Sequence, residues 1–195
     1  MGLKIAICDP YHGGSHRVWA RELAQCIKRE PEWECRLFTL PGKHWKWRMH
    51  GAAATFAHLL EAESPFDVLI TTDMLDAAQL RGLLPPHQGQ VRLAVYFHEN
   101  QLTFPWSPED KDRTNGRDRT YGHINIVSAL AADAVWFNSS HHKSVFLDAV
   151  KRFYNPMPDA RLRHAHETIT NRSQVLPIGL NLSCLLYTSP SPRDS

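Results

Sequence analysis

The sequence lacks any long hydrophobic run. None of its apolar stretches approaches the roughly 18 consecutive residues that a membrane-spanning helix needs. Met1 to Lys4 leads directly into a strand pattern, without the basic start and apolar core of a secretory signal peptide. The expectation is therefore a soluble protein without a membrane partner.

Cysteine is also scarce. The four cysteines, Cys8, Cys26, Cys35 and Cys184, show neither the paired spacing of a zinc site nor the density of a disulfide scaffold. Histidines are more numerous, but His141, His142, His164 and His166 do not form a zinc-ligand pattern either. We therefore expect cysteines that serve as packing residues, a reducing cytoplasmic location and no bound metal.

An excess of one charge is missing as well. The 22 basic and 20 acidic side chains leave a net charge of only +2. This total does not by itself indicate a nucleic-acid partner, although a local basic patch could still bind one. The 195 residues are enough for one α/β domain with a sizeable core.

What the chain does contain is a regular alternation of short apolar runs and helical patterns. The expected strands are 4–8, 34–40, 68–72, 91–97, 134–138 and 174–178, and the expected helices are 17–29, 49–62, 73–84, 121–132 and 141–153. Ser139 is a suitable N-cap for the last of these helices. Strands that alternate with helices predict crossover units and a doubly wound, parallel, Rossmann-like α/β sheet.

Polar side chains follow the fourth expected strand abruptly. Its apolar run ends in His98, Glu99, Asn100 and Gln101. Ligands of open α/β sheets bind beyond the carboxyl ends of the strands, so this run is a candidate site, with His98 and Glu99 as acid, base or hydroxyl-orienting groups. Alternatively, Asn100 and Gln101 cap the next turn and His98 is a half-buried, hydrogen-bonded histidine.

The first expected strand leads into Gly13, Gly14, Ser15 and His16, before the first helix. Backbone N–H groups and the helix dipole can hold a phosphate at such a position. The loop lacks the full dinucleotide fingerprint and the Walker lysine pattern, so an ordinary turn is the alternative.

A third segment interleaves cations with aromatic side chains: Lys43, Trp45, Lys46, Trp47 and Arg48. Such a segment could contact phosphates and stack on bases, as single-stranded nucleic-acid surfaces do. The alternative is a solvated turn whose tryptophans cover the edge of the sheet.

Five motifs in order resemble the N-terminal domain of the tRNA-queuosine α-mannosyltransferase family. They are residues 9–16, 39–48, 96–102, 121–122 and 132–139, and the similarity spans 4–182. The resemblance implies the N-terminal half of a GT-B glycosyltransferase, a fold of two Rossmann-like domains with the active cleft between them. It also implies transfer of mannose from GDP-mannose to queuosine in a tRNA, with retention of configuration and no other cofactor.

The same resemblance implies roles for the candidate residues. His98 and Glu99 would position the acceptor hydroxyl, and the loop from Gly13 to His16 would approach the donor diphosphate or the acceptor. The segment from Lys43 to Arg48, with Asn100 and Gln101, would contact the tRNA. Two alternatives stay open, namely a GT-B enzyme that acts on a small molecule or glycan, and a non-catalytic RNA-binding Rossmann-like module.

The resemblance further predicts that 1–182 is the acceptor-side domain and that the C-terminal donor domain is missing, so that this chain alone is inactive. Residues 183–195 have no helix or strand period. They resemble translated sequencing-adapter read-through, and the alternative is a genuine disordered tail rich in Ser and Pro.

Overall fold

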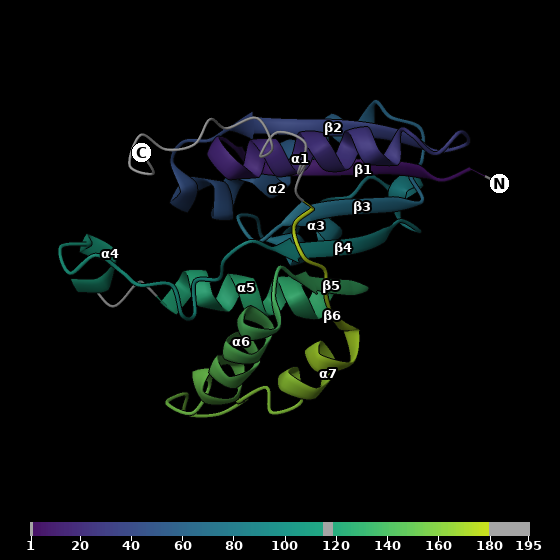
Figure 1. Cartoon of the computed structure of the whole chain (residues 1–195). Coiled ribbons are helices and arrows are strands. Elements are labelled where there is room, and N and C mark those ends of the chain that lie inside the picture. The colour runs from purple at the N-terminus through teal and green to yellow at the C-terminus, as the bar shows by residue number, and fades with distance from the viewer. Residues whose placement is uncertain (1, 115–118, 180–195) are drawn as a thin grey trace, which may run out of the picture.

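In the computed structural model, which describes residues 2–114 and 119–179, six parallel strands pair in the order β2-β1-β3-β4-β5-β6 (Figure 1). The strands are β1 (Lys4–His12), β2 (Glu34–Pro41), β3 (Val68–Thr72), β4 (Arg92–Phe97), β5 (Ala134–Phe137) and β6 (Ser173–Val175). All five neighbouring pairs are parallel, which confirms the predicted Rossmann-like sheet. The expected tail 183–195 lies outside the described residues.

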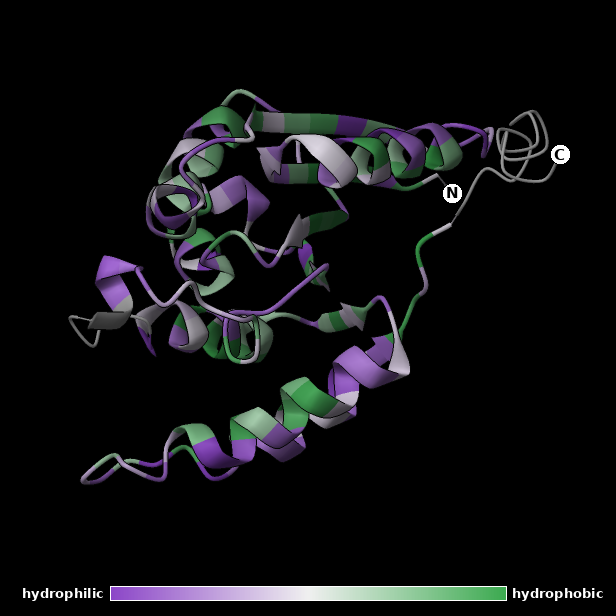
Figure 2. Cartoon of the chain, turned by 60° about the vertical axis from the view of Figure 1, so that its left-hand side comes forward, coloured by the Kyte–Doolittle hydropathy of each residue, from purple (hydrophilic) through white to green (hydrophobic). Residues whose placement is uncertain are grey.

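Helices connect the strands. They are α1 (Gly14–Ile27), α2 (Trp45–Glu61), α3 (Ala77–Leu83), α4 (Lys111–Thr114), α5 (Arg119–Ala131), α6 (Ser140–Phe153) and α7 (Ala165–Arg172), with a 3-10 turn η1 (Pro86–Gln88). Figure 2 shows that α6 carries its hydrophobic residues on one side and its polar residues on the other. This amphipathic pattern is typical of a helix that packs against a sheet.

The two faces of the sheet are covered unequally. On one face, side chains of β1, β3, β4 and β5 form a large core with α2, α3, α5, α6 and α7, in which Phe56, Phe97 and Phe137 are fully buried. On the other face, α1 packs against β1 and β2 and forms a smaller core around Ile7 and Ala20. We call these the covered face and the open face.

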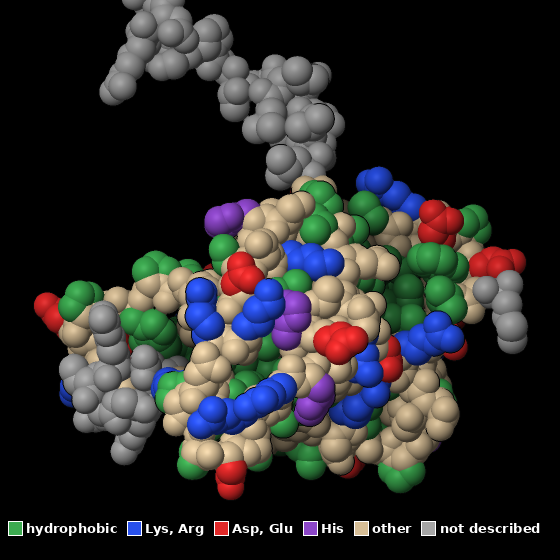
Figure 3. Space-filling model, turned by 90° about the horizontal axis from the view of Figure 1, so that it is seen from below, with side chains coloured by type: hydrophobic (Ala, Val, Ile, Leu, Met, Phe, Trp, Pro, Cys, Tyr) green, Lys and Arg blue, Asp and Glu red, His purple; other side chains and the backbone are tan. Residues whose placement is uncertain are grey.

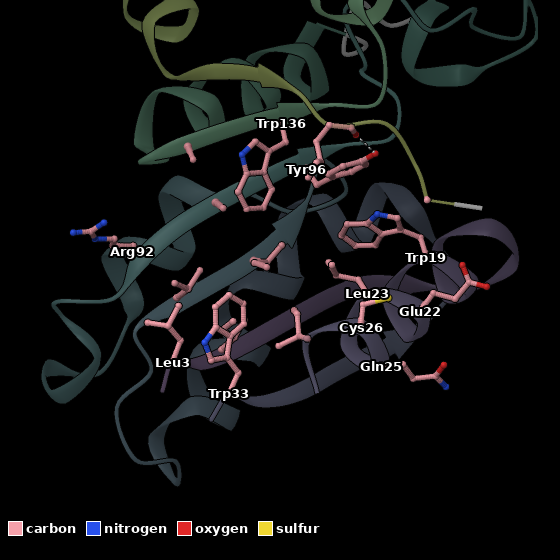
Figure 4. A pocket seen from close by; sticks show the side chains of 18 of the residues that line it. Leu3, Trp19, Glu22, Leu23, Gln25, Cys26, Trp33, Arg92, Tyr96 and Trp136 are labelled. Atoms are coloured by element: carbon pink, nitrogen blue, oxygen red, sulfur yellow. Dashed lines mark hydrogen bonds between the residues drawn. The ribbon is translucent and has the colours of Figure 1, made fainter. Parts of the chain in front are cut away.

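The open face carries a cavity of about 960 Å³ over β3, β4 and β5, beyond the edge of α1. Figure 4 shows Trp19, Tyr96 and Trp136 around one part of it and Leu3 and Trp33 around another. The hydroxyl of Tyr96 donates a hydrogen bond of 2.8 Å to the carbonyl of Leu176, which ties the chain after β6 to this face.

Several helix boundaries differ from the prediction; α1, for example, spans Gly14–Ile27 rather than 17–29. The shifted starts of α2 and α3 have local causes. Helix α2 begins at Trp45 rather than at residue 49, because His44 adopts a left-handed conformation with φ 55° and turns the chain into the helix. Helix α3 begins at Ala77 rather than at residue 73, because the carboxylate of Asp76 caps it by accepting a hydrogen bond from the N–H of Gln79. Asp73 is thereby left outside the helix, at the end of β3.

Two other predictions are confirmed, the bounds of β3 and the N-cap of α6. The observed bounds of β3 are those predicted, and the Ser139 hydroxyl caps α6 by accepting a hydrogen bond from the N–H of His142. Cys8 and Cys35 are buried packing residues, whereas Cys26 is exposed, and Cys184 lies outside the described residues. Among the described residues, no helix is long and apolar enough to cross a membrane.

Candidate active site at the carboxyl edge of the sheet

The strand order reverses between β1 and β3, because the chain moves from β1 to β2 on one side and then to β3 on the other. Ligands of open α/β sheets bind beyond the carboxyl ends of the strands at such a switch point. Polar residues lie at the ends of β1, β3 and β4 here, and the site described below is the carboxyl edge that they form.

The glycine loop after β1 lies at this edge. Gly14 has φ +50°, a left-handed conformation that strains other residues, so glycine is required there. A Cβ atom on Gly42 would lie 2.8 Å from the Cα of Gly13, which shows how closely the loops after β1 and β2 approach. Helix α1 begins at Gly14 without a side-chain cap, so its first N–H groups are available to an anion.

Asp9 and His12 form a pair at the end of β1. The Asp9 carboxylate is fully buried and lies 2.7 Å from Nδ1 of His12, and it also accepts a hydrogen bond from the N–H of Tyr11. These contacts fix the loop that leads to Gly13 and Gly14. Both residues belong to the motif 9–16, but the sequence analysis did not single them out.

The imidazole ring of His98 is surrounded by other aromatic rings. Its ring centroid is 4.4 Å from that of His16, 4.6 Å from that of Trp19 and 4.8 Å from that of Tyr96. Burial, together with the neighbouring His16 and His142, lowers the pKa of His98 to about 3. His98 is therefore a neutral imidazole at physiological pH and exchanges hydrogen bonds with a ligand without bringing a charge.

Asp73 supports the same loop from the end of β3. Its Oδ1 accepts a hydrogen bond of 2.9 Å from the N–H of His98. Burial, and next the charge of Glu99, raise the pKa of Asp73 well above its usual range, and burial also raises the pKa of Glu99. Two acids held near each other in this way favour at least one protonated carboxyl group, which can donate a hydrogen bond.

The end of β5 completes the edge. The side-chain amide of Asn138 donates a hydrogen bond of 2.8 Å to the carbonyl of His98, and its Oδ1 lies 3.0 Å from Nδ1 of His142. Burial lowers the pKa of His142 to about 4, so it too is neutral at physiological pH. His142 contacts Phe97 and Phe137 on the covered face, whereas His98 contacts Trp19 and Tyr96 on the open face.

Several buried polar atoms of this edge have no hydrogen-bond partner within the described parts of the chain. They are Nδ1 of His16, Oγ1 of Thr72, Oδ2 of Asp73, Nε2 of His98 and Nε2 of His142. A buried polar atom without a partner costs free energy, about 1–3 kcal/mol for a neutral group, so such atoms are rare in packed cores. Their concentration at one edge indicates a site whose polar ligand supplies the missing bonds.

Asn100 and Gln101 belong to the loop that follows. Oδ1 of Asn100 accepts hydrogen bonds from the N–H groups of Leu102 and Thr103, so its side chain caps this turn. The N–H of Gln101 donates to Oδ1 of Asn125, whose amide in turn donates to the carbonyl of Asp73. Asn125 therefore holds the β3 and β4 loops together, and the contact of Asn100 and Gln101 with an acceptor stays a prediction.

The basic aromatic segment is divided between two environments. Nζ of Lys46 lies 2.7 Å from a carboxylate oxygen of Asp110 and 2.5 Å from one of Asp112, and Trp45 packs against Trp106 and Tyr121. Both residues thus anchor the loop that precedes α4.

Trp47, in contrast, is 63% exposed and lies over Gly51, where an added Cβ atom would meet its ring at 2.7 Å. Lys43 is exposed too, and Nε of Arg48 donates to the carbonyl of Pro41. Lys43, Trp47 and Arg48 are thus the members of the segment for which no contact with the loop before α4 is seen among the described residues, and RNA binding by the segment stays a prediction.

A scan against protein families matches residues 4–180 to the family described as tRNA-queuosine alpha-mannosyltransferase N-terminal. The chain belongs to this family. It is also 38% identical over 177 residues to a protein of Drosophila melanogaster named tRNA-queuosine alpha-mannosyltransferase. This alignment covers 91% of the chain and 45% of the fly protein, so the chain spans about half the length of this curated relative.

The family match covers the whole carboxyl edge. Of the site residues that the sequence predicted, the structure brings together His16, His98 and Glu99. Sequence reasoning missed Asp73, Asn138 and His142 as site residues. Each comes directly after a strand or in the first turn of the following helix, and this position was the signal that could have found them.

The histidines of this family member do not form a metal centre in the parts of the chain that the structure describes. No group of three or more His, Cys, Asp or Glu side chains there has the geometry to hold a metal ion. What the carboxyl edge offers is hydrogen bonds from neutral imidazoles and from carboxyl groups of raised pKa, next to the uncapped N-terminus of α1. Such groups suit the hydroxyl groups of a sugar or nucleoside.

Proposed function

We propose that the full-length protein transfers mannose from GDP-mannose to queuosine in a tRNA in the cytoplasm, with retention of configuration, and that this chain is its acceptor-side domain. The observation that carries the proposal is the cluster of unpartnered polar atoms at the carboxyl edge, in a chain of the tRNA-queuosine alpha-mannosyltransferase N-terminal family. The name of the fly relative supports the sugar and the acceptor.

His98 and Glu99 position the acceptor hydroxyl in this proposal. Nε2 of His98 is buried and unpartnered, and the lowered pKa of His98 leaves the ring uncharged and able to accept the hydrogen bond of a hydroxyl. Asp73 and Asn138 are positioning residues, because each binds the backbone of His98. Holding the hydroxyl in a reactive orientation supplies much of the rate enhancement.

The donor diphosphate approaches the loop from Gly13 to His16. Support comes from the uncapped start of α1, from the left-handed Gly14 and from the unpartnered Nδ1 of buried His16. The remaining donor contacts belong to a part of the protein outside this chain. The isolated chain is therefore expected to show little or no transfer.

The test is transfer from GDP-mannose to queuosine-containing tRNA by the full-length protein and by its His98→Ala variant. We expect kcat/KM to fall about a hundredfold in the variant, because the group that orients the acceptor is lost. The matched control is His58→Ala, since His58 is an exposed histidine on α2 whose partner among the described residues is Glu61.

The acceptor class is tested in the same assay. Transfer to a glycan or a small molecule but not to tRNA would replace the acceptor in the proposal. RNA binding without any binding of GDP-mannose would favour a non-catalytic RNA-binding module. Equal activity of the His98→Ala and His58→Ala variants would remove the proposed role of His98.

A further inference from the structure

A second polar pocket lies at the other end of α6. It has a volume of about 290 Å³ and is lined by Val150, Lys151, Asn155, Arg161, Leu162, Arg163 and His166. None of these residues is acidic. We call Lys151, Arg161 and Arg163 the α6–α7 cationic surface.

The region that contains this pocket carries a net positive charge. Residues 140–175 contain six Lys and Arg and three Asp and Glu, a net charge of +3 against +2 for the whole chain. Figure 3 looks at the molecule from below, the side on which α6 and α7 lie in Figure 1, and shows Lys, Arg and His side chains spread over this face, with Asp and Glu side chains among them. The near-neutral total therefore conceals a local positive surface.

The two arginines are available to a ligand. Lys151 has a partner in Asp148 at 3.3 Å, but no described residue forms an ion pair with Arg161 or Arg163. Arg161 donates its Nε–H to the carbonyl of Met157 at 2.8 Å, which orients the guanidinium group and leaves its terminal NH2 groups for an anion. A guanidinium group held in this way suits bidentate binding of a phosphate.

The backbone fixes where these arginines lie. Ala160 and Leu162 on either side of Arg161 have positive φ values of 44° and 34°, which are unfavourable for residues other than glycine. Leu162 is held by packing against the large core of the covered face, and this packing offsets the strain. Arg161 and Arg163 are exposed as a result, one on each side of an anchored residue.

Helix α7 begins at the same pocket. Its N-cap, His164, makes no side-chain hydrogen bond to the first turn, which contains His166. The N–H of Ala165 donates to the carbonyl of Leu162, and Glu167 in the first turn offsets part of the positive end of the helix dipole. The positive charge that favours a phosphate at this pocket therefore comes from the arginines.

The position of the pocket limits what the ligand can be. Helix α6 starts beside His142 at the carboxyl edge, and its 14 residues end beside the pocket. At 1.5 Å per residue the two ends of α6 lie about 21 Å apart. A nucleoside or a small sugar cannot reach both places, whereas a nucleic-acid strand can.

We infer that the α6–α7 cationic surface binds a backbone phosphate of the tRNA whose modified base occupies the carboxyl edge. The inference rests on the tRNA acceptor of the proposed function. It adds a second contact, away from the reacting groups, through which the domain distinguishes a tRNA from a free nucleoside. Phosphate contacts of this kind fix the register of the nucleic acid and carry no base specificity.

The experiment measures binding of a fluorescent queuosine-containing tRNA to the 195-residue chain at several salt concentrations. For Arg161→Ala/Arg163→Ala we expect affinity to fall about tenfold, and the slope of log K against log salt to become less negative by about 0.8, since the contact with one phosphate is lost. Arg161→Lys/Arg163→Lys keeps both charges and should retain most of the affinity.

The matched control is Arg21→Ala/Arg29→Ala, which removes two exposed arginines on the α1 side of the sheet and should leave affinity and slope unchanged. Thermal unfolding of each variant shows whether it is folded. The inference would be overturned if the Arg161/Arg163 and Arg21/Arg29 variants bound tRNA with equal affinity. It would also be overturned if the wild-type chain did not bind tRNA.

A second measurement separates this inference from the proposed function. In the full-length protein, Arg161→Ala/Arg163→Ala should raise the KM for tRNA about tenfold and leave the KM for GDP-mannose unchanged. Transfer to tRNA with an unchanged KM would refute the phosphate contact and keep the proposed function. RNA binding that depends on these arginines, without any transfer, would keep the contact and refute the proposed function.

Discussion

The two faces of the sheet use the same strands in opposite ways. On the covered face, Phe97 and Phe137 stack with ring centroids 5.1 Å apart and are fully buried under the helices. On the open face, Tyr96 and Trp136, which alternate with them along β4 and β5, line the cavity of about 960 Å³. Alternation along a strand sends neighbouring side chains to opposite faces, so residues adjacent in sequence have different energetic roles.

This difference teaches that burial, and not hydrophobicity alone, determines what each residue contributes to stability. Trp136 is larger than Phe137, yet it is only partly buried and packs against the smaller core, whereas Phe137 is fully buried in the large core. The same division extends to the carboxyl edge, where His142 contacts the covered core and His98 contacts the aromatic rings of the open face.

The largest effect on stability is expected from truncating a buried ring on the covered face. Phe137→Ala should lower the free energy of unfolding by about 3–5 kcal/mol, because it removes a fully buried ring and leaves a cavity among Phe97 and Phe146. Trp136→Ala, one residue away, should cost less than about half as much, since it truncates a ring that is already partly exposed to solvent. Urea denaturation of both variants measures the difference. Equal costs would mean that the two faces contribute alike.

A smaller effect concerns pH at the edge where the faces meet. The pKa of His98 is lowered to about 3 and that of His142 to about 4, mainly by burial, against about 6.5 in the unfolded chain. Below pH 6.5 the unfolded chain takes up protons that the folded chain does not, so stability that is present above pH 6.5 is lost as the pH falls toward 4.

His98→Gln should remove part of this loss, on the order of 2 kcal/mol between pH 7 and pH 4.5. Urea denaturation at a series of pH values measures it. His58→Gln, at an exposed position on α2, should leave the pH dependence as it is in the wild type. A pH dependence that is the same in all three proteins would show that His98 is protonated in the folded state.

Asp73 is expected to show the opposite sign. Burial raises its pKa in the folded state, so the folded chain holds a proton more readily, and stability falls as the pH rises through that pKa. Asp73→Asn keeps an oxygen that accepts from the N–H of His98 and removes the buried charge.

We therefore expect Asp73→Asn to raise the free energy of unfolding at pH 7.5 by about 1 kcal/mol. In the full-length protein we expect the same variant to lower transfer activity. Denaturation at pH 7.5 and at pH 4 tests whether the gain in stability comes from removing the buried charge, since that gain in stability should shrink at the lower pH. A loss of stability at both pH values would mean that Asp73 is simply a structural hydrogen-bonding group.

The fold was predictable from the sequence because its determinants are local. Residues 68–72 form an apolar β-branched run between turn residues, and Ser139 stands directly before a helical pattern, and both were placed correctly. The start of α2 was missed because it depends on the left-handed conformation of His44, which is uncommon for residues other than glycine and leaves no clear sequence signal.

The candidate site was only partly predictable, because it depends on contacts between distant segments. His98 stood out as the polar end of an apolar strand. Asp73, Asn138 and His142 become site residues only when parallel strands bring residues 25 to 44 positions away beside His98. In the same way, Lys46 looked like a free cation until the fold placed Asp110 and Asp112 against it.

The smallest effect on stability is expected from removing one hydroxyl group on the open face. Tyr96→Phe removes the 2.8 Å hydrogen bond to the carbonyl of Leu176 and should lower the free energy of unfolding by only about 0.5–1 kcal/mol. Its local effect should be clearer, because the N–H of Leu176 donates to the carbonyl of Phe137 and holds the chain after β6 beside β5. Hydrogen exchange of the Leu176 amide should become faster. Tyr154→Phe, which removes a hydroxyl that contacts His123 on the covered side, should leave that amide unchanged, so equal exchange rates in the two variants would show that Tyr96 does not fasten this segment.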